Sequence, residues 1–231
     1  MKATHLTQIL IDSEPHFSLE WLAIHSPFFQ KEHLEKLAIN LITSYTEGIS
    51  ENLPFPHFNE EVTPLLYDAF SNFQQSLKVI QEHDYNSNII TQKIIAKTIE
   101  TIAFEDILLL MGQRITSATI KNINGLPLLK QEVLESCFKP YNKHISVAVR
   151  AWEKHIDRSE DSFWGEIQGK PIEKEEKARA LINTLIDEHT WWNVFYHYKH
   201  ELVYEVRVAS GHGMRWSLKD KALIGFLEPF L

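Results

Sequence analysis

Residues 202–208 read LVYEVRV, and residues 214–218 read MRWSL. Apolar and polar side chains alternate in both runs, which is the pattern of half-buried strands. A turn is expected between them, at Gly211-His212-Gly213. A three-residue loop at 211–213 places Val208 opposite Trp216 and keeps the apolar side chains on one face. We prefer it to a four-residue loop at 210–213, and we expect a glycine in the left-handed conformation there.

The rest of the sheet is expected downstream of this hairpin. A second turn is predicted at Asp220-Lys221, followed by a third strand over 222–227. The aromatic run 191–198 is compatible with either a helix or an extended chain. The C-terminal end of the chain therefore predicts a small, three-stranded antiparallel sheet.

The chain upstream of residue 158 has the periodicity of helices. Only Gly48 lies before position 112, and so few glycines suit helices better than tight turns. Helices are predicted over residues 31–47, 60–82, 88–111, 113–121, 128–138, 141–157 and 172–188, with loops at 52–57 and 158–172. The predicted fold is mainly α (α+β): a helical bundle with a small C-terminal three-stranded antiparallel sheet. We expect one domain over 1–231, with a helical body over 1–157 and a helix plus sheet over 158–231.

The bulk composition limits the partners and the compartment. The 31 acidic and 23 basic residues give a net charge of −8, which argues against a nucleic-acid partner. The single cysteine allows no disulfide within the chain and no cysteine-built zinc site. The N-terminal apolar run is too short for a signal peptide, and the long apolar region 89–111 carries five charges. We therefore expect a cytoplasmic protein with no membrane partner.

The last third of the chain carries a set of specific motifs. They are Lys139-Pro140, His144, Arg150-Ala151, Lys154-His155, Trp164-Gly165, Trp192-Asn193, Glu205-Val206-Arg207, Gly211-His212-Gly213-Met214-Arg215-Trp216 and Gly225-Phe226-Leu227-Glu228-Pro229. Over residues 138–229 the chain thus resembles an uncharacterised family found in plants and bacteria. The resemblance implies no particular activity and no catalytic residue.

The polar face of the predicted hairpin is a candidate binding site. Glu205, Arg207 and Arg215 share the face opposite the apolar side chains. A carboxylate between two guanidiniums could hold an anionic or planar ligand. The alternative is a cross-strand ion pair on a solvated face, and the pattern alone favours this alternative.

Twelve histidines are a high number for a chain of 231 residues. His144 and His155 lie eleven residues apart on one predicted helix, facing the same way at about 16 Å, so they could line one groove as general acid or base. The spacing of His197 and His200 would suit two metal ligands on a helix, with His189 or His212 as a third. A structural role is the more common one for such histidines, and we expect no metal site.

Three functional interpretations follow, and the sequence does not decide whether the protein is an enzyme or which cofactor it uses. The first is a protein that binds a small anionic ligand where the helix 141–157 meets the sheet. Its site would use His144, His155, Arg150, Glu205, Arg207, Arg215 and Trp216. The second is a non-catalytic protein that binds another protein, such as a bacterial effector or regulator. The third is a histidine-based metalloprotein.

Overall fold

The computed structural model describes residues 2–230, which form two compact units. Unit 1 contains residues 2–53, 62–114 and 120–126, and unit 2 contains residues 54–61, 115–119 and 127–230. Whether the chain behaves as one domain stays a prediction. None of the helices in this part of the chain is long and apolar enough to cross a bilayer.

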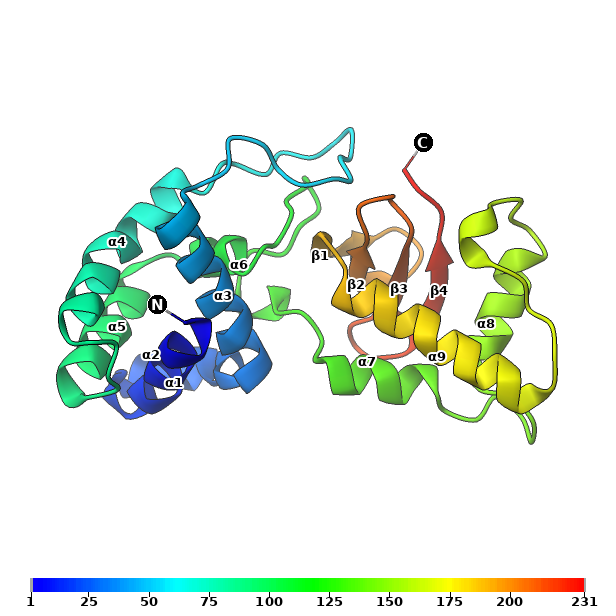
Figure 1. The fold of residues 1–231 in the computed structure, drawn as a ribbon, viewed down its shortest axis with the longest axis horizontal. Helices are drawn as coiled ribbons and strands as arrows, with labels where there is room; N and C mark the ends of the chain where they lie inside the picture. The colour runs from blue at the N-terminus through cyan, green and yellow to red at the C-terminus, as the bar shows by residue number, and fades with distance from the viewer. Residues whose placement is uncertain (1, 231) are drawn as a thin grey trace. The chain divides into compact units, whose positions relative to one another are not determined.

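Unit 1 is helical (Figure 1). Its elements are α1 (Ala3–Ser13), η1 (Glu14–His16), α2 (Leu19–His25), η2 (Ser26–Phe29), α3 (Lys31–Glu47), α4 (Tyr67–Glu82), α5 (Ile89–Thr101), α6 (Phe104–Leu110) and η3 (Ile123–Gly125). Apolar side chains at helical spacing along α3, such as Leu34, Leu37 and Leu41, are fully buried. Gly48 ends α3 with a positive φ of 86°, as predicted.

Two of the helices predicted between residues 60 and 121 were wrong in their extent, and a third does not form. The predicted helix 60–82 begins only at Tyr67, because Pro64 disfavours helical backbone before it. Val62 and Leu65, upstream of the helix, are exposed. The predicted helix 88–111 is broken where Ile102 adopts extended backbone. No helix forms over 113–121, where β-branched residues follow a glycine.

Unit 2 carries the sheet and the helices that pack on it. Its elements are α7 (Lys130–Cys137), α8 (Val147–Ile156), η4 (Ser162–Trp164), α9 (Pro171–Asp187), β1 (Trp191–His197), β2 (Glu201–Arg207), β3 (Gly213–Ser217) and β4 (Leu223–Leu227). The sheet is antiparallel with the order β1-β2-β3-β4, so it has four strands instead of three. The additional strand is the aromatic run, which pairs with β2 along its whole length.

The hairpin between β2 and β3 has a longer loop than predicted. Tyr204 pairs with Trp216 and Val206 with Met214, so the predicted pairing of Val208 with Trp216 was wrong. The loop spans Val208–His212 and contains Gly211 at a φ of 92°. The side chains keep their predicted faces because the pairing differs by an even number of residues.

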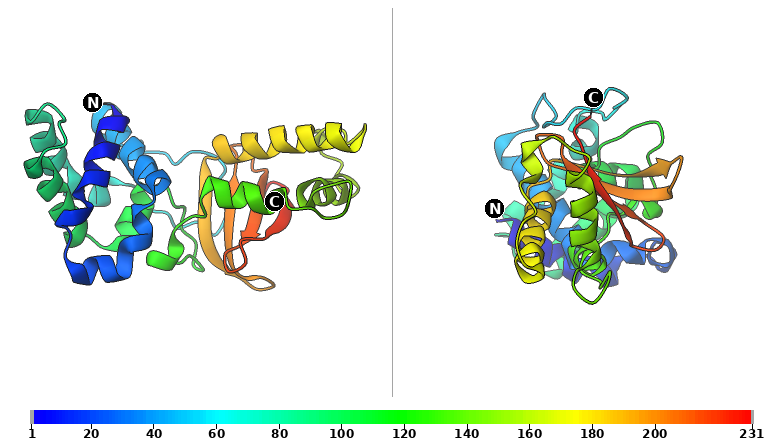
Figure 2. Two further views of the ribbon diagram at one scale, coloured as in Figure 1. Left: turned by 90° about the horizontal axis from the view of Figure 1, so that it is seen from below. Right: turned by 90° about the vertical axis from the view of Figure 1, so that its right-hand side faces the viewer.

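The helices of unit 2 cover the sheet. The right-hand view of Figure 2 shows α8 and α9 side by side on one side of it, and α8 packs against the edge strand β4. At the opposite edge the segment 115–119 pairs with β1, through an isolated bridge between Thr119 and Phe195. The predicted helix 141–157 begins only at Val147, because the Ser146 side chain caps it by accepting a hydrogen bond from the Val149 amide.

Candidate active site

A histidine–carboxylate pair lies where α8 meets the end of β4. Nε2 of His155, near the end of α8, is 2.9 Å from Oε1 of Glu228, directly after β4. The indole Nε1–H of Trp164 donates a second hydrogen bond to the same oxygen, at 3.0 Å. Glu228 thus links the end of the sheet to α8 and to the loop that follows it.

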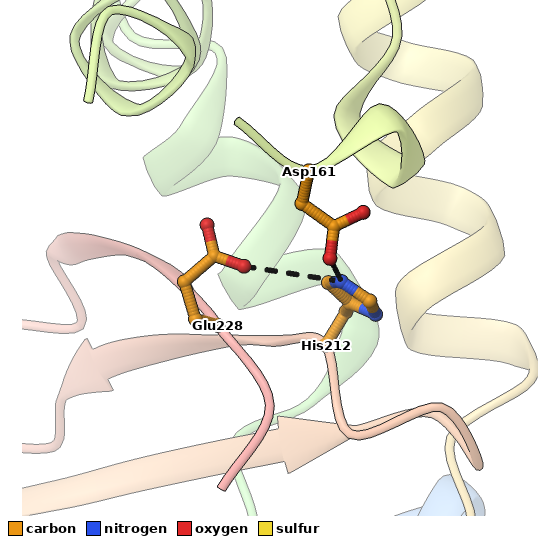
Figure 3. Close-up of side chains that lie close together, drawn as sticks. All are labelled: Asp161, His212 and Glu228. Atoms are coloured by element: carbon orange, nitrogen blue, oxygen red, sulfur yellow. Dashed lines mark hydrogen bonds and ion pairs between the residues drawn. The ribbon is translucent and has the colours of Figure 1, made fainter. Parts of the chain in front are cut away.

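A second pair, between His212 and Asp161, lies beside Glu228 (Figure 3). Nε2 of His212, in the hairpin loop, is 2.8 Å from Oδ2 of Asp161 and 3.9 Å from Oε2 of Glu228. Its Nδ1 is 2.9 Å from the Ser210 hydroxyl oxygen. The ring is stacked on Phe163, with 3.8 Å between the centroids. Two hydrogen bonds and this stacking therefore fix the orientation of the His212 ring.

Both carboxylates are stabilised in the ionised form. The backbone amide of Phe163 and the His212 side chain hold the pKa of Asp161 below its usual value. Burial works to raise the pKa of Glu228, but hydrogen bonds from Ser159 and Trp164 and the charge of His155 outweigh it, and the pKa is lowered. An ionised carboxylate only accepts hydrogen bonds, so Nε2 carries the proton in both histidines.

This assignment distinguishes the two rings. In His155 the unprotonated Nδ1 makes no hydrogen bond to any residue between 2 and 230 and is available to accept a proton. In His212 both nitrogens are occupied, and its side chain is only 7% exposed against 18% for His155. His155 is therefore the better proton acceptor, while His212 supports the loops around it.

The lowered pKa of Asp161 predicts a specific pH dependence of stability. A carboxylate whose pKa is depressed by folding contributes stability above its unfolded pKa, and this contribution is lost as the pH falls through the folded value. We expect the urea midpoint of the wild type to decrease as the pH is lowered below 3.8, the ordinary pKa of an aspartate carboxyl group. Asp161→Asn should be less stable near neutral pH and show a flatter decline in acid, and parallel curves would contradict the role given to Asp161.

The polar face of the hairpin is a buried ion cluster and not a solvated face. Glu205 is 1% exposed and receives Nε of Arg207 at 2.5 Å and Nε of Arg215 at 2.7 Å on its two oxygens. Burial is the largest effect on Arg207 and lowers its pKa, while Glu205 acts against this. Arg207 also donates from Nη1 to the carbonyl oxygens of Gly211 at 2.6 Å and Glu228 at 2.7 Å.

These contacts leave little of the cluster for a ligand. Arg207 joins the loop that carries His212 to the segment that carries Glu228, and its guanidinium lies 3.8 Å from the ring centroid of Phe230. Trp216 was a predicted ligand contact, but its side chain is fully buried in the core. The geometry favours a structural role for both.

An open cleft of about 420 Å³ lies between α8 and β4. Its lining includes Arg150, Lys154, His155, Arg158 and Tyr141 on one side and Leu223 to Phe226 on the other. Three basic side chains thus line the same cleft as His155. A cleft of this volume with a few convergent polar groups is typical of a binding site.

The other predicted histidines lie apart from this cleft. His144 is exposed in the turn before α8. The prediction that it shares a helix with His155 was therefore wrong. The rings of His197 and His200 stack at 5.1 Å near the β1–β2 turn, but no third ligand among residues 2–230 joins them. The spacing alone was therefore a poor guide to these residues.

One group within the described chain has the composition of a metal site. Ligand atoms of Asp161, His212 and Glu228 lie within 4.8 Å of one another. However, His212 Nε2 and Asp161 Oδ2 are hydrogen-bonded directly, and Oε1 of Glu228 already accepts from Trp164. The pairs would have to separate, and Nε2 would have to lose its proton, before a cation could bind.

Cys137 does not take part in this site. The thiol is fully buried, and burial raises its pKa to about 11. We expect the native protein to resist alkylation by iodoacetamide at pH 8 and to react only after unfolding in urea. Rapid modification of the folded protein, measured by mass spectrometry, would contradict this description.

The cleft combines a histidine that is hydrogen-bonded to a carboxylate with three basic side chains. A family model for the CdiA C-terminal tRNase toxin domain matches residues 134–228, which is less than half of the chain. No curated protein and no solved structure gives a significant match.

This match overturns the main functional interpretation drawn from the sequence. A toxin domain that acts on tRNA is a nuclease effector and not a protein that binds a small anionic ligand. The bacterial-effector alternative fits in part, although it was framed as non-catalytic. The expectation of no nucleic-acid partner conflicts with the match, and it rested on the net charge of the whole chain. Residues 134–228 contain 14 basic and 15 acidic residues, so most of the acidic excess lies elsewhere.

Proposed function

We propose that residues 134–228 form a ribonuclease that cleaves tRNA and acts as a toxin. The observation that carries this proposal is the match to the CdiA C-terminal tRNase toxin domain over these residues. The cleft beside α8 supports it, because its basic side chains suit a polyanionic substrate.

The chemistry needs few protein groups because RNA supplies its own nucleophile, the 2′-hydroxyl next to the scissile phosphate. Nδ1 of His155 accepts the proton of that hydroxyl, and the 2′ oxygen forms a bond to phosphorus. The bond between phosphorus and the 5′ oxygen breaks, and the leaving oxygen takes a proton from water. The products are a 2′,3′-cyclic phosphate and a 5′-hydroxyl, with no change of oxidation state.

Glu228 is the positioning residue for this step. By accepting the Nε2 proton of His155, it fixes the tautomer in which Nδ1 is free. It also stabilises the imidazolium that forms when His155 takes the proton. The basic side chains in the cleft stabilise the charge that develops on the phosphate oxygens.

A protein partner follows from this function. An enzyme that destroys tRNA would harm the cell that makes it, so a producing cell needs a protein that blocks the cleft. Such a partner would need acidic side chains to match Arg150, Lys154 and Arg158.

The direct test is expression of the full chain from a tightly repressed promoter in a bacterial host. We expect growth to stop and total RNA to show tRNA-derived fragments on a denaturing gel. His155→Ala should restore both growth and intact tRNA. Arrested growth with intact tRNA would contradict the proposal, and so would fragments that persist in the variant.

A further inference from the structure

We propose that the cleft between α8 and β4 binds a single-stranded segment of RNA, with backbone phosphates along α8 and an unstacked base on Tyr141. This inference rests on the proposed function and adds the form of the substrate at that site. The juxtaposition behind it is a row of cations, an exposed aromatic ring and an apolar wall in one cleft.

The cations are placed to follow a strand. Arg150 and Lys154 lie one helical turn apart on α8, and Arg158 lies in the turn that follows. Four residues of helix correspond to about 6 Å, which is comparable to the step between neighbouring phosphates of an extended strand. His155 lies within this row, so a strand bound here brings a phosphate to its ring.

The part of the chain that the structure describes offers these cations little neutralisation. Among residues 2–230, the side chains of Lys154 and Arg158 make no ion pair or hydrogen bond. Arg150 has one distant carboxylate, at 3.7 Å, and this Glu153 also binds Lys174 at 2.9 Å. The Arg150 side chain is 37% exposed, and it also lines the cleft, so its guanidinium is open to a phosphate there.

The aromatic and apolar side chains of the cleft suit an unstacked base of a single strand better than double-stranded RNA. The Tyr141 side chain is 54% exposed at the cleft, with the Arg150 guanidinium 5.9 Å from its ring centroid. Aromatic rings beside arginines are the usual platform for unstacked RNA bases. Val147, Ala151 and Leu223 add apolar contacts, and the volume of about 420 Å³ suits a nucleotide held in a cleft and not a double helix.

The test is a binding measurement that does not depend on cleavage. The probe is a short, fluorescein-labelled 2′-O-methyl oligonucleotide, which lacks the nucleophile, used alone and annealed to its complement. Affinity of the full chain is measured by fluorescence anisotropy over a range of salt concentrations in EDTA. We expect the single strand to bind more tightly than the duplex.

The variants then locate the strand. Each of Arg150→Gln, Lys154→Gln and Arg158→Gln should lower the slope of log K against log salt by about 0.7, and the triple variant by about 2. Tyr141→Ala should weaken binding by about 5- to 150-fold. The matched control is Lys199→Gln, in the β1–β2 turn at the far edge of the sheet, which should change neither quantity.

The outcomes separate this inference from the proposed function. Unchanged slopes in the three charge variants, or a preference for the duplex, would overturn the inference even if the protein cleaves tRNA. Slopes that fall as expected would support the cleft as a single-strand site even if no cleavage occurs. In that second case only the proposed function would fail.

Discussion

Replacing His155 by alanine should lower the rate of tRNA cleavage by about 100- to 10 000-fold, the usual contribution of a general base. The physical reason is that His155, alone among the histidines of residues 2–230, combines a free Nδ1, a carboxylate on its other nitrogen and a position in the cationic cleft. Truncation removes the proton acceptor but leaves the basic side chains that bind the substrate. The rate should therefore fall far more than the affinity for RNA. The measurement is the initial rate with purified full chain and labelled tRNA.

The matched control is His144→Ala. His144 was the other histidine predicted to be catalytic, but it is exposed in the turn before α8 and does not line the cleft. We expect its rate to stay within about twofold of the wild type, since surface substitutions away from such features have small effects. Equal losses in the two variants would contradict the role given to His155. A wild-type rate in His155→Ala would do so as well.

Glu205→Gln should destabilise unit 2 by about 3–5 kcal/mol, the usual cost of removing one member of a buried ion cluster. Glu205 is almost fully buried and holds both Arg207 and Arg215, so neutralising it leaves two poorly solvated guanidiniums facing each other. Arg207 also anchors the loops of His212 and Glu228, and cleavage should weaken along with stability.

Urea unfolding followed by tryptophan fluorescence measures this loss, because five of the six tryptophans lie in unit 2. The control is Glu166→Gln, an exposed glutamate in the loop before α9, for which we expect a change within about 0.5 kcal/mol. A similar small change in Glu205→Gln would show that the cluster contributes little, as ion pairs on a solvated face do.

The fold class was predictable from local pattern, and the contacts between distant segments were not. Alternation in residues 202–208 identified β2 and the faces of its side chains, because the period of a strand does not depend on its partners. It could not show that Phe230 and the segment that contains Thr119 contact the polar face. Glu205 and Arg207 were therefore interpreted as solvated, although both are buried. The aromatic run of β1 was ambiguous because it is apolar on both faces.

Only some residues of the candidate site could be predicted from the sequence. His155 and Arg150 were identified on their helix, but their partner Glu228 lies 73 residues from His155, and spacing gives no access to such a contact. Asp161 lies in an irregular loop with no motif around it, and no sequence signal could have identified it. The charge argument used one net value for the whole chain, and a net value cannot show that Arg150, Lys154 and Arg158 line the same cleft.

The most direct test of the account is the chemistry of the ends that purified full chain leaves on tRNA in the presence of EDTA. We predict cleavage that persists in the chelator and gives a 2′,3′-cyclic phosphate and a 5′-hydroxyl, because the 2′-hydroxyl is the nucleophile and His155 its base. Intact tRNA, or cleavage that stops in EDTA and leaves a 3′-hydroxyl and a 5′-phosphate, would contradict this account.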